Sequence, residues 1–234
     1  MIKRLPSFDR RAVLILVWVP IALTLIEYFF VPGRAGRFFE WARAAEPGSL
    51  QQLYVYLWWI FGTLALAALV PTLLIRALGI RPKEIGLRFK GTAKHASIYL
   101  WLYLAMVPVI YLASQDPSFR SAYPFFQSIG GLSDPNFWIF EFAYFLQFFA
   151  VEYFFRGFMV LGLKPVLGPS SILVMLAPYC MIHFHKPFPE ALAAIGAGLI
   201  LGTLSYQTET VIYGWFLHYG VALTMDLLAM QRPF

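Results

Sequence analysis

Residues 137–158 read FWIFEFAYFLQFFAVEYFFRGF, an apolar run long enough to cross a lipid bilayer. Near the end of this run, a carboxylate and a guanidinium group stand one helical turn apart, at Glu152 and Arg156. Placing a charge in the hydrocarbon region costs roughly 2.5–3.5 kcal/mol on insertion scales, so such residues usually face a bundle interior and carry function. The segment therefore predicts a membrane-spanning helix with two ionisable groups on its inner face.

The composition of the whole chain agrees with this prediction. Of its 234 residues, 60% are hydrophobic and 13% are charged, whereas about 25% of residues are charged in soluble proteins. We expect an all-α, polytopic transmembrane bundle, with residues 1–234 forming a single integral membrane domain. Apolar windows predict about seven spans, near 12–31, 53–75, 96–114, 137–159, 170–185, 190–206 and 210–230. The fifth and sixth are short, and the turn between them is expected at membrane depth.

The net charge of +6 follows the pattern of a topology signal. Basic residues gather before the first span and in the second connection: Lys3, Arg4, Arg10, Arg11, Arg76, Arg81, Lys83, Arg88, Lys90 and Lys94. By the positive-inside rule, the N-terminus and the 76–94 loop are expected in the cytoplasm. We expect a multi-pass protein of a bacterial inner membrane, in contact with the lipid bilayer and not with nucleic acid.

Two histidines, His183 and His218, lie in apolar segments further along the chain. Together with Glu152 they form a two-histidine-plus-carboxylate set, a combination that binds zinc or orients a water molecule. Two other interpretations stay open. Glu152 and Arg156 share a helix face and could form an ion pair that only fixes the bundle, and each histidine could be a hydrogen-bonded packing residue.

The remaining acidic residues have simpler explanations. Asp134 precedes Pro135 and predicts a helix N-cap. Glu209 is expected in the opening turn of the last helix, where the helix dipole favours a carboxylate. Glu141 lies about 16 Å from Glu152 along a regular helix and is expected near the outer interface. Asp226 follows His218 by two turns, too far for the two to bind one ion.

Three short motifs follow one another in the second half of the chain. Residues 151–156 read Val-Glu-Tyr-Phe-Phe-Arg, residues 179–183 end in His183, and His218 is followed four positions later by Ala222. These motifs resemble those of the CPBP family of intramembrane proteases, which includes the CAAX prenyl endopeptidases and bacteriocin-processing proteins. The resemblance covers residues 137–230. Two positions differ, since the family has a glutamate at Val151 and an asparagine or aspartate at Ala222.

The resemblance implies an intramembrane endopeptidase acting on a membrane-embedded or lipidated peptide or protein substrate. In this interpretation Glu152 is the general base and Arg156 positions it. His183 and His218 would orient the water or bind a divalent metal such as zinc.

Val151 and Ala222 favour a second interpretation. In the family the leading glutamate is usually taken to activate the water, and the polar group of the third motif to help hold the tetrahedral intermediate. Without them the chain could be a catalytically inactive member that serves as a membrane scaffold, chaperone or immunity protein. A proton-coupled transporter is less well supported, because the seven segments show no paired halves.

Overall fold

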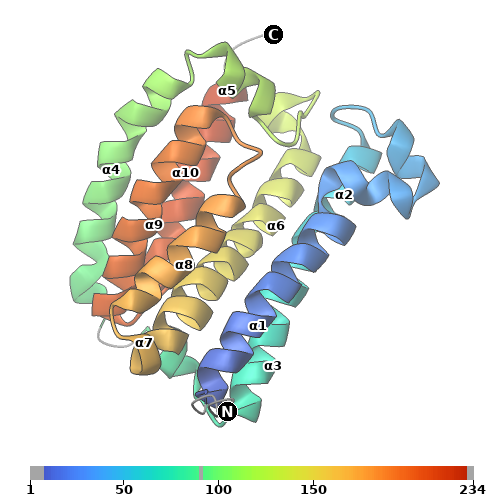
Figure 1. Ribbon diagram of the computed structural model, residues 1–234. Helices are drawn as coiled ribbons and strands as arrows, with labels where there is room; N and C mark the ends of the chain where they lie inside the picture. The colour runs from blue at the N-terminus through green and yellow to red at the C-terminus, as the bar shows by residue number, and fades with distance from the viewer. Residues whose placement is uncertain (1–7, 90–91, 231–234) are drawn as a thin grey trace.

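The structure, a computed structural model, describes residues 8–89 and 92–230, and every regular element among them is helical (Figure 1). The α-helices are α1 (Arg10–Leu25), α2 (Leu50–Leu64), α3 (Val70–Ala77), α4 (Ala96–Ala113), α5 (Pro117–Ala122), α6 (Pro135–Glu152), α7 (Gly162–Leu167), α8 (Ser170–Met181), α9 (Phe188–Thr208) and α10 (Ile212–Met230). Three of the basic residues used to predict topology, Lys3, Arg4 and Lys90, lie outside the described residues.

Within the described residues, five helical stretches are long and apolar enough to cross a membrane: Arg10–Phe30, Leu50–Ala77, Ala93–Ala113, Pro135–Leu167 and Phe188–Thr208. The chain is therefore an all-α bundle of membrane helices, as predicted. The other two predicted spans form α8 and α10. α8 has 12 residues, a length of about 18 Å by helix rise, and α10 has 19 residues that include His218 and Asp226.

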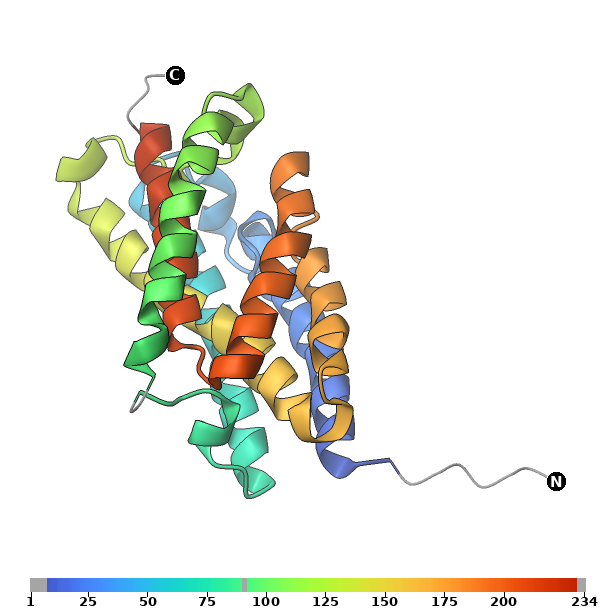
Figure 2. The same cartoon turned by 90° about the vertical axis from the view of Figure 1, so that its left-hand side faces the viewer.

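The helix that contains α6 lies at the centre of the bundle (Figures 1 and 2). In the stretch Pro135–Leu167, 83% of the most apolar window is buried inside the protein, against 11–33% in the other four stretches. α2 and α10 pack directly on α6. The outer helices expose large apolar side chains, such as Trp101 and Leu112 on α4, which suits contact with lipid. Charged groups on α6 are consequently enclosed by protein.

A π-helical segment, Tyr153–Leu161, continues α6 beyond Glu152. Segments with i→i+5 hydrogen bonds are rare and occur frequently at functional sites. All nine of its residues are buried. A Cβ atom at Gly157 would lie 2.5 Å from the carbonyl oxygen of Ile85, so the backbone of the second connection rests directly on the helix. The π segment thus keeps Arg156 inside the protein.

α6 begins at the predicted N-cap. The Asp134 side chain accepts a hydrogen bond of 2.9 Å from the backbone N–H of Asn136, and Pro135 occupies the first turn; the predicted N-cap is confirmed. On α9, a Cβ at Gly198 would lie 2.6 Å from the Leu176 side chain. Small residues therefore let α9 approach α8 closely.

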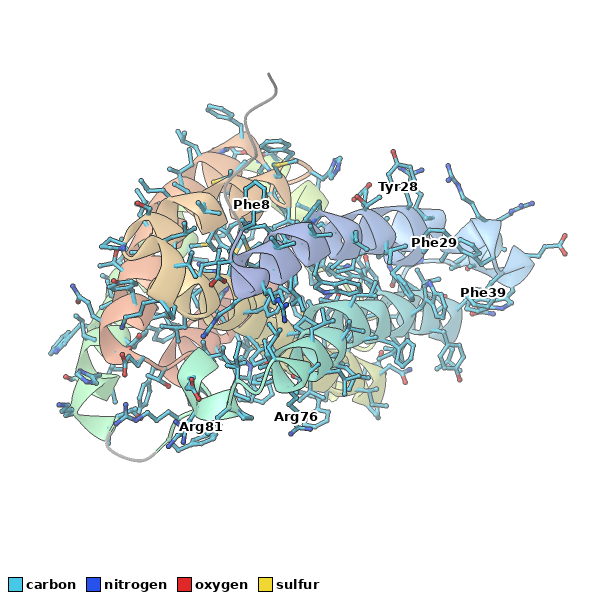
Figure 3. All side chains as sticks on the ribbon, turned by 60° about the horizontal axis from the view of Figure 1, so that its bottom comes forward. Phe8, Tyr28, Phe29, Phe39, Arg76 and Arg81 are labelled. Atoms are coloured by element: carbon cyan, nitrogen blue, oxygen red, sulfur yellow. The ribbon has the colours of Figure 1, made fainter. Side chains whose placement is uncertain are left out.

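Glu209 takes a different place from the predicted one. It ends α9 in a left-handed conformation, with φ of 55°, and does not open α10. Its carboxylate accepts hydrogen bonds from Lys164 at 2.8 Å and from Arg88 at 3.3 Å, so two cations hold the side chain at this end of the bundle. Figure 3 shows Arg76 and Arg81 at this end, which we call the basic end, and Tyr28, Phe29 and Phe39 at the opposite end of α1 and α2.

Candidate functional site

The geometry of the site begins with a hydrogen bond between α6 and α10. Glu152, the last residue of α6, has no exposed surface, and its Oε1 atom lies 2.7 Å from Nδ1 of His218. The His218 side chain is 18% exposed. One turn before His218, a Cβ at Gly214 would come within 2.9 Å of the Glu152 carboxylate. The glycine lets the backbone of α10 lie directly against this carboxylate.

Arg156 is the second charged group of the site and is also fully buried. Its Nη1 atom lies 3.2 Å from Oε1 of Glu152, although the angles are too poor for a hydrogen bond. The guanidinium carbon lies 4.1 Å above the ring of Tyr179 on α8, a cation–π arrangement. Arg156 therefore acts on Glu152 through charge, and Tyr179 supports it from the other side.

His183 is connected to the site by its contacts with Tyr179. Its Nδ1 atom lies 2.8 Å from the backbone carbonyl of Tyr179, and the two rings are 4.8 Å apart. The ring of Tyr179 also lies 6.4 Å from that of His218. The motif at residues 179–183 includes Tyr179, but we did not predict a role for it. Its spacing of four residues from His183 was the available signal.

The hydrogen-bond partners fix the tautomer of both histidines. A carbonyl oxygen and an ionised carboxylate only accept hydrogen bonds, so Nδ1 carries the proton in His183 and in His218. In the neutral form of each ring, the Nε2 atom keeps its lone pair. His183 lies in the turn after α8 and His218 on α10, and each lone pair can accept a hydrogen bond from a water or take a proton from it.

The arrangement fits a metal ion poorly. Among residues 8–89 and 92–230, no three His, Cys, Asp or Glu side chains come together in a way that could hold one. The Glu152 oxygen nearest His218 also faces the guanidinium group of Arg156, which opposes a second cation there. His183 and His218 supply two nitrogen donors at most, fewer than the three protein ligands of usual catalytic zinc sites.

The two residues that differ from the family motifs, Val151 and Ala222, pack among apolar side chains. Val151 is half-buried and packs against the core cluster that contains Phe154 and Phe155. Ala222 is buried in a second cluster with Tyr144 and Phe148. Neither position offers a polar atom to the site.

The other acidic residues lie away from Glu152. Glu141 is 1% exposed, because α6 is enclosed along most of its length, and its position near the outer interface stays a prediction. Its carboxylate accepts a hydrogen bond of 3.2 Å from the Tyr219 hydroxyl. Asp226 is buried beside it. The two form a separate cluster between α6 and α10.

Comparison with known proteins assigns this part of the chain. Residues 133–224 match the family model of the type II CAAX prenyl endopeptidase Rce1-like proteins. Residues 133–224 are an Rce1-like domain. The match includes all four candidate site residues: Glu152, Arg156, His183 and His218. No curated protein and no solved structure matches the chain.

The match supports two statements at the level of the family. The Rce1-like domain belongs to a family of intramembrane endopeptidases, so the predicted membership in the CPBP family is confirmed. Together with the apolar helices, it establishes an integral membrane protein.

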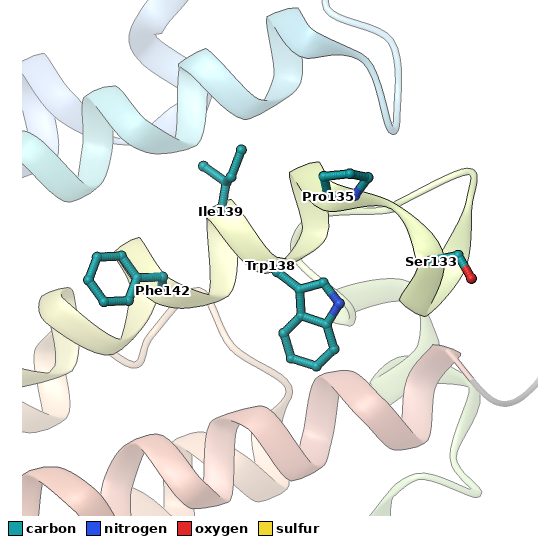
Figure 4. Close-up of a pocket in the computed structure, with 5 residues that line it drawn as sticks. All are labelled: Ser133, Pro135, Trp138, Ile139 and Phe142. Atoms are coloured by element: carbon teal, nitrogen blue, oxygen red, sulfur yellow. The ribbon is translucent and has the colours of Figure 1, made fainter.

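A surface hollow of about 590 Å³ near the start of α6 is separate from this site (Figure 4). Its lining consists of Ser133, Pro135, Trp138, Ile139 and Phe142. Trp138, Ile139 and Phe142 are all exposed. The hollow is open and apolar at the outside of the Rce1-like domain, as expected of a surface that contacts lipid tails.

Proposed function

We propose that this protein is an intramembrane endopeptidase in which His218 activates water and Glu152 acts through His218. The hydrogen bond of 2.7 Å between Glu152 and His218 carries the proposal. From the sequence, Glu152 was expected to act on the water itself. Its complete burial favours an indirect role, because the partly exposed His218 ring is the group that a water or substrate can meet.

The proposed steps use only side chains of this chain. A water hydrogen-bonded to Nε2 of His218 gives its proton to that atom as its oxygen attacks the carbonyl carbon of the scissile peptide bond. The imidazolium that forms is stabilised by the Glu152 carboxylate, and Arg156 keeps this carboxylate ionised. When the tetrahedral intermediate collapses, Nε2 returns the proton to the leaving amine. The Nε2 lone pair of His183 orients the water.

The substrate that fits this proposal is a membrane-associated peptide or protein, either lipidated or membrane-embedded. The family description names prenylated CAAX substrates, which make a prenylated CAAX peptide the first probe to use. We also propose that the protein lies in a bacterial inner membrane, with its N-terminus and the 76–94 loop in the cytoplasm. The binding of zinc by His183 and His218, which the sequence predicts, stays a prediction, and the proposed mechanism does not require it.

The test is a cleavage assay in proteoliposomes. Purified protein is incubated with a prenylated peptide that ends in a CAAX sequence, and the products are identified by mass spectrometry. We expect release of the C-terminal residues by the unmutated protein and no release by His218→Ala, with Glu152→Gln strongly reduced. Cleavage by the His218→Ala variant at the unmutated rate would exclude the proposed mechanism.

One alternative function has specific support. Because Val151 and Ala222 are apolar and packed in the core, the chain could bind a membrane substrate without cleaving it, as a scaffold, chaperone or immunity protein. Binding of the prenylated peptide to both the unmutated protein and His218→Ala, with no product from either, would favour this alternative. Introducing Val151→Glu would then test whether one carboxylate restores cleavage.

A further inference from the structure

A pair of buried carboxyl groups connects α6 and α10 away from the Glu152–His218 hydrogen bond. Glu141 on α6 and Asp226 on α10 are each 1% exposed. Their side chains approach closely enough to share a hydrogen bond. Two ionised carboxylates cannot do so, because neither has a hydrogen to donate.

The hydrogen-bond partners around this pair are incomplete. Tyr219 donates to Oε2 of Glu141 at 3.2 Å. The other three oxygen atoms, Oε1 of Glu141 and both of Asp226, are buried and have no well-aligned donor among the described residues, although the backbone N–H of Phe125 lies near the Asp226 carboxyl group. A buried ionised oxygen without a well-aligned partner is costly, so a bound proton would stabilise this carboxyl pair.

Nearby cations do not neutralise the pair. The titratable groups near the pair are Tyr56, Tyr123, Tyr144, Lys186 and Tyr219. Glu190 on α9 lies next to Tyr123 and Lys186. Lys186 donates to the Tyr123 hydroxyl at 2.7 Å and lies 3.7 Å from Glu190. Burial lowers the pKa of Lys186, which further limits it as a counter-ion.

The charges therefore do not balance unless a proton is bound. Lys186 is the ammonium group near Asp226, but it contacts the carboxylate of Glu190, and no cation of the described residues contacts Glu141 or Asp226. We propose that Glu141 and Asp226 form a proton-binding site in which the two carboxyl groups share one proton. The shared proton lies between α6 and α10, the two helices that supply Glu152 and His218.

Infrared spectroscopy tests this directly. The unmutated protein in detergent micelles at pH 7 should show a protonated-carboxyl band that is missing from the Glu141→Gln/Asp226→Asn double variant. The band should disappear from the unmutated protein at alkaline pH. Glu27→Gln serves as the control, since Glu27 is a half-exposed carboxylate paired with Arg34, and it should leave the band unchanged. A spectrum in which the double variant loses no such band would overturn the proposal.

The dependence of unfolding on pH is a second measurement. Unfolded Asp and Glu are ionised above about pH 4–5, so the folded protein holds one proton more than the unfolded chain. Above that pH, the ratio of folded to unfolded protein should fall by about tenfold for each unit that the pH rises, until the folded protein releases the shared proton. The double variant should lack this one-proton component. If it does not fold, Asp226→Asn alone serves, because its amide can donate to Glu141.

A bound cation is the competing explanation for the close carboxyl pair. If the pair holds a proton, sodium or calcium chloride should shift the thermal midpoint of the unmutated protein and that of the double variant by the same amount. If either cation stabilises only the unmutated protein, and the protonated-carboxyl band is missing, the pair binds a metal cation and the proton site is excluded. None of these measurements depends on peptidase activity, so the result stands apart from the proposed function.

Discussion

The guanidinium group of Arg156 lies between the carboxylate of Glu152 and the ring of Tyr179, 3.2 Å from Oε1 and 4.1 Å from the ring centroid. The arginine comes from the π segment and the tyrosine from α8. One fully buried side chain thereby connects the carboxylate of the site to the helix that precedes His183. The contact thus joins the π segment, α8 and the carboxylate of the site.

Replacing Arg156 by alanine should destabilise the protein. The change leaves Glu152 charged and buried without its partner, which typically costs roughly 3–5 kcal/mol. Thermal unfolding in detergent micelles measures the loss. Arg34→Ala is the matched control, because Arg34 forms a partly exposed pair with Glu27 and should change stability by less than about 1 kcal/mol. Equal stability of the Arg156→Ala and unmutated proteins would contradict the structure's ion pair.

Replacing Glu152 by glutamine should separate catalysis from stability. Glutamine keeps the size of the side chain but removes the charge that stabilises protonated His218, so cleavage should fall by at least about a hundredfold. Stability should change less than in Arg156→Ala. The comparison uses initial cleavage rates and thermal midpoints, with Glu27→Gln as the control. A folded Glu152→Gln protein that cleaves at the unmutated rate would show that this carboxylate is structural.

Metal analysis should find less than one zinc per chain. His183 and His218 offer two nitrogen donors, and Arg156 opposes a further cation at Glu152. Elemental analysis of the purified protein, before and after dialysis against a chelator, gives the zinc content. One zinc per chain that is lost in both His183→Ala and His218→Ala would instead establish a metal centre.

The direction of insertion can be tested with introduced cysteines in a Cys180→Ala background. Leu132, which is 52% exposed, lies in the 115–136 loop, and Phe89, which is 71% exposed, lies in the basic second connection. Leu132 is preferable to its neighbour Gly131, whose φ of 58° disfavours a side chain. We expect an impermeant thiol reagent to label Leu132→Cys from outside and Phe89→Cys only after permeabilisation. The reverse pattern would invert the topology.

Acid should weaken the ion pairs at the basic end. The hydrogen bond from Lys164, with Arg88 nearby, holds the pKa of Glu209 below its ordinary value. The resulting stability is present above the unfolded pKa and is lost as pH falls through the folded pKa. Glu209→Gln should therefore lower the thermal midpoint at pH 7 and have little effect at pH 3. The side chain is 52% exposed, so less than about 1 kcal/mol is expected.

Glutamine has no more freedom than glutamate at the positive φ of residue 209, which makes the variant well matched. Glu46→Gln is the control, since Glu46 is exposed and has no ion pair within the described residues. If the difference between Glu209→Gln and the unmutated protein persists at pH 3, the effect does not come from the ionised carboxylate.

The sequence carried enough information for the helices and for part of the site. Charges such as Glu152 are rare in apolar runs, so their inward position could be predicted from cost alone. The enclosure of Glu141 could not be predicted in this way, because it depends on which helix lies at the centre of the bundle. The ion pairs of Glu209 involve two cations distant in sequence, Arg88 and Lys164, which no local pattern shows. The role of Tyr179 depends on the π segment that brings Arg156 to its ring, and no local pattern predicts that segment.

The length of α8 has a consequence for the surrounding membrane. Its 12 residues reach about 18 Å, well short of a hydrocarbon core of about 30 Å. The turn that follows satisfies several backbone N–H groups internally, as in the bonds from His183 to Cys180 and from Phe184 to Met181. Lipids beside α8 meet a short apolar wall with a polar turn above it (Figure 1). Short helices of this kind are generally accommodated by local thinning of the bilayer, and the turn at this short end carries His183.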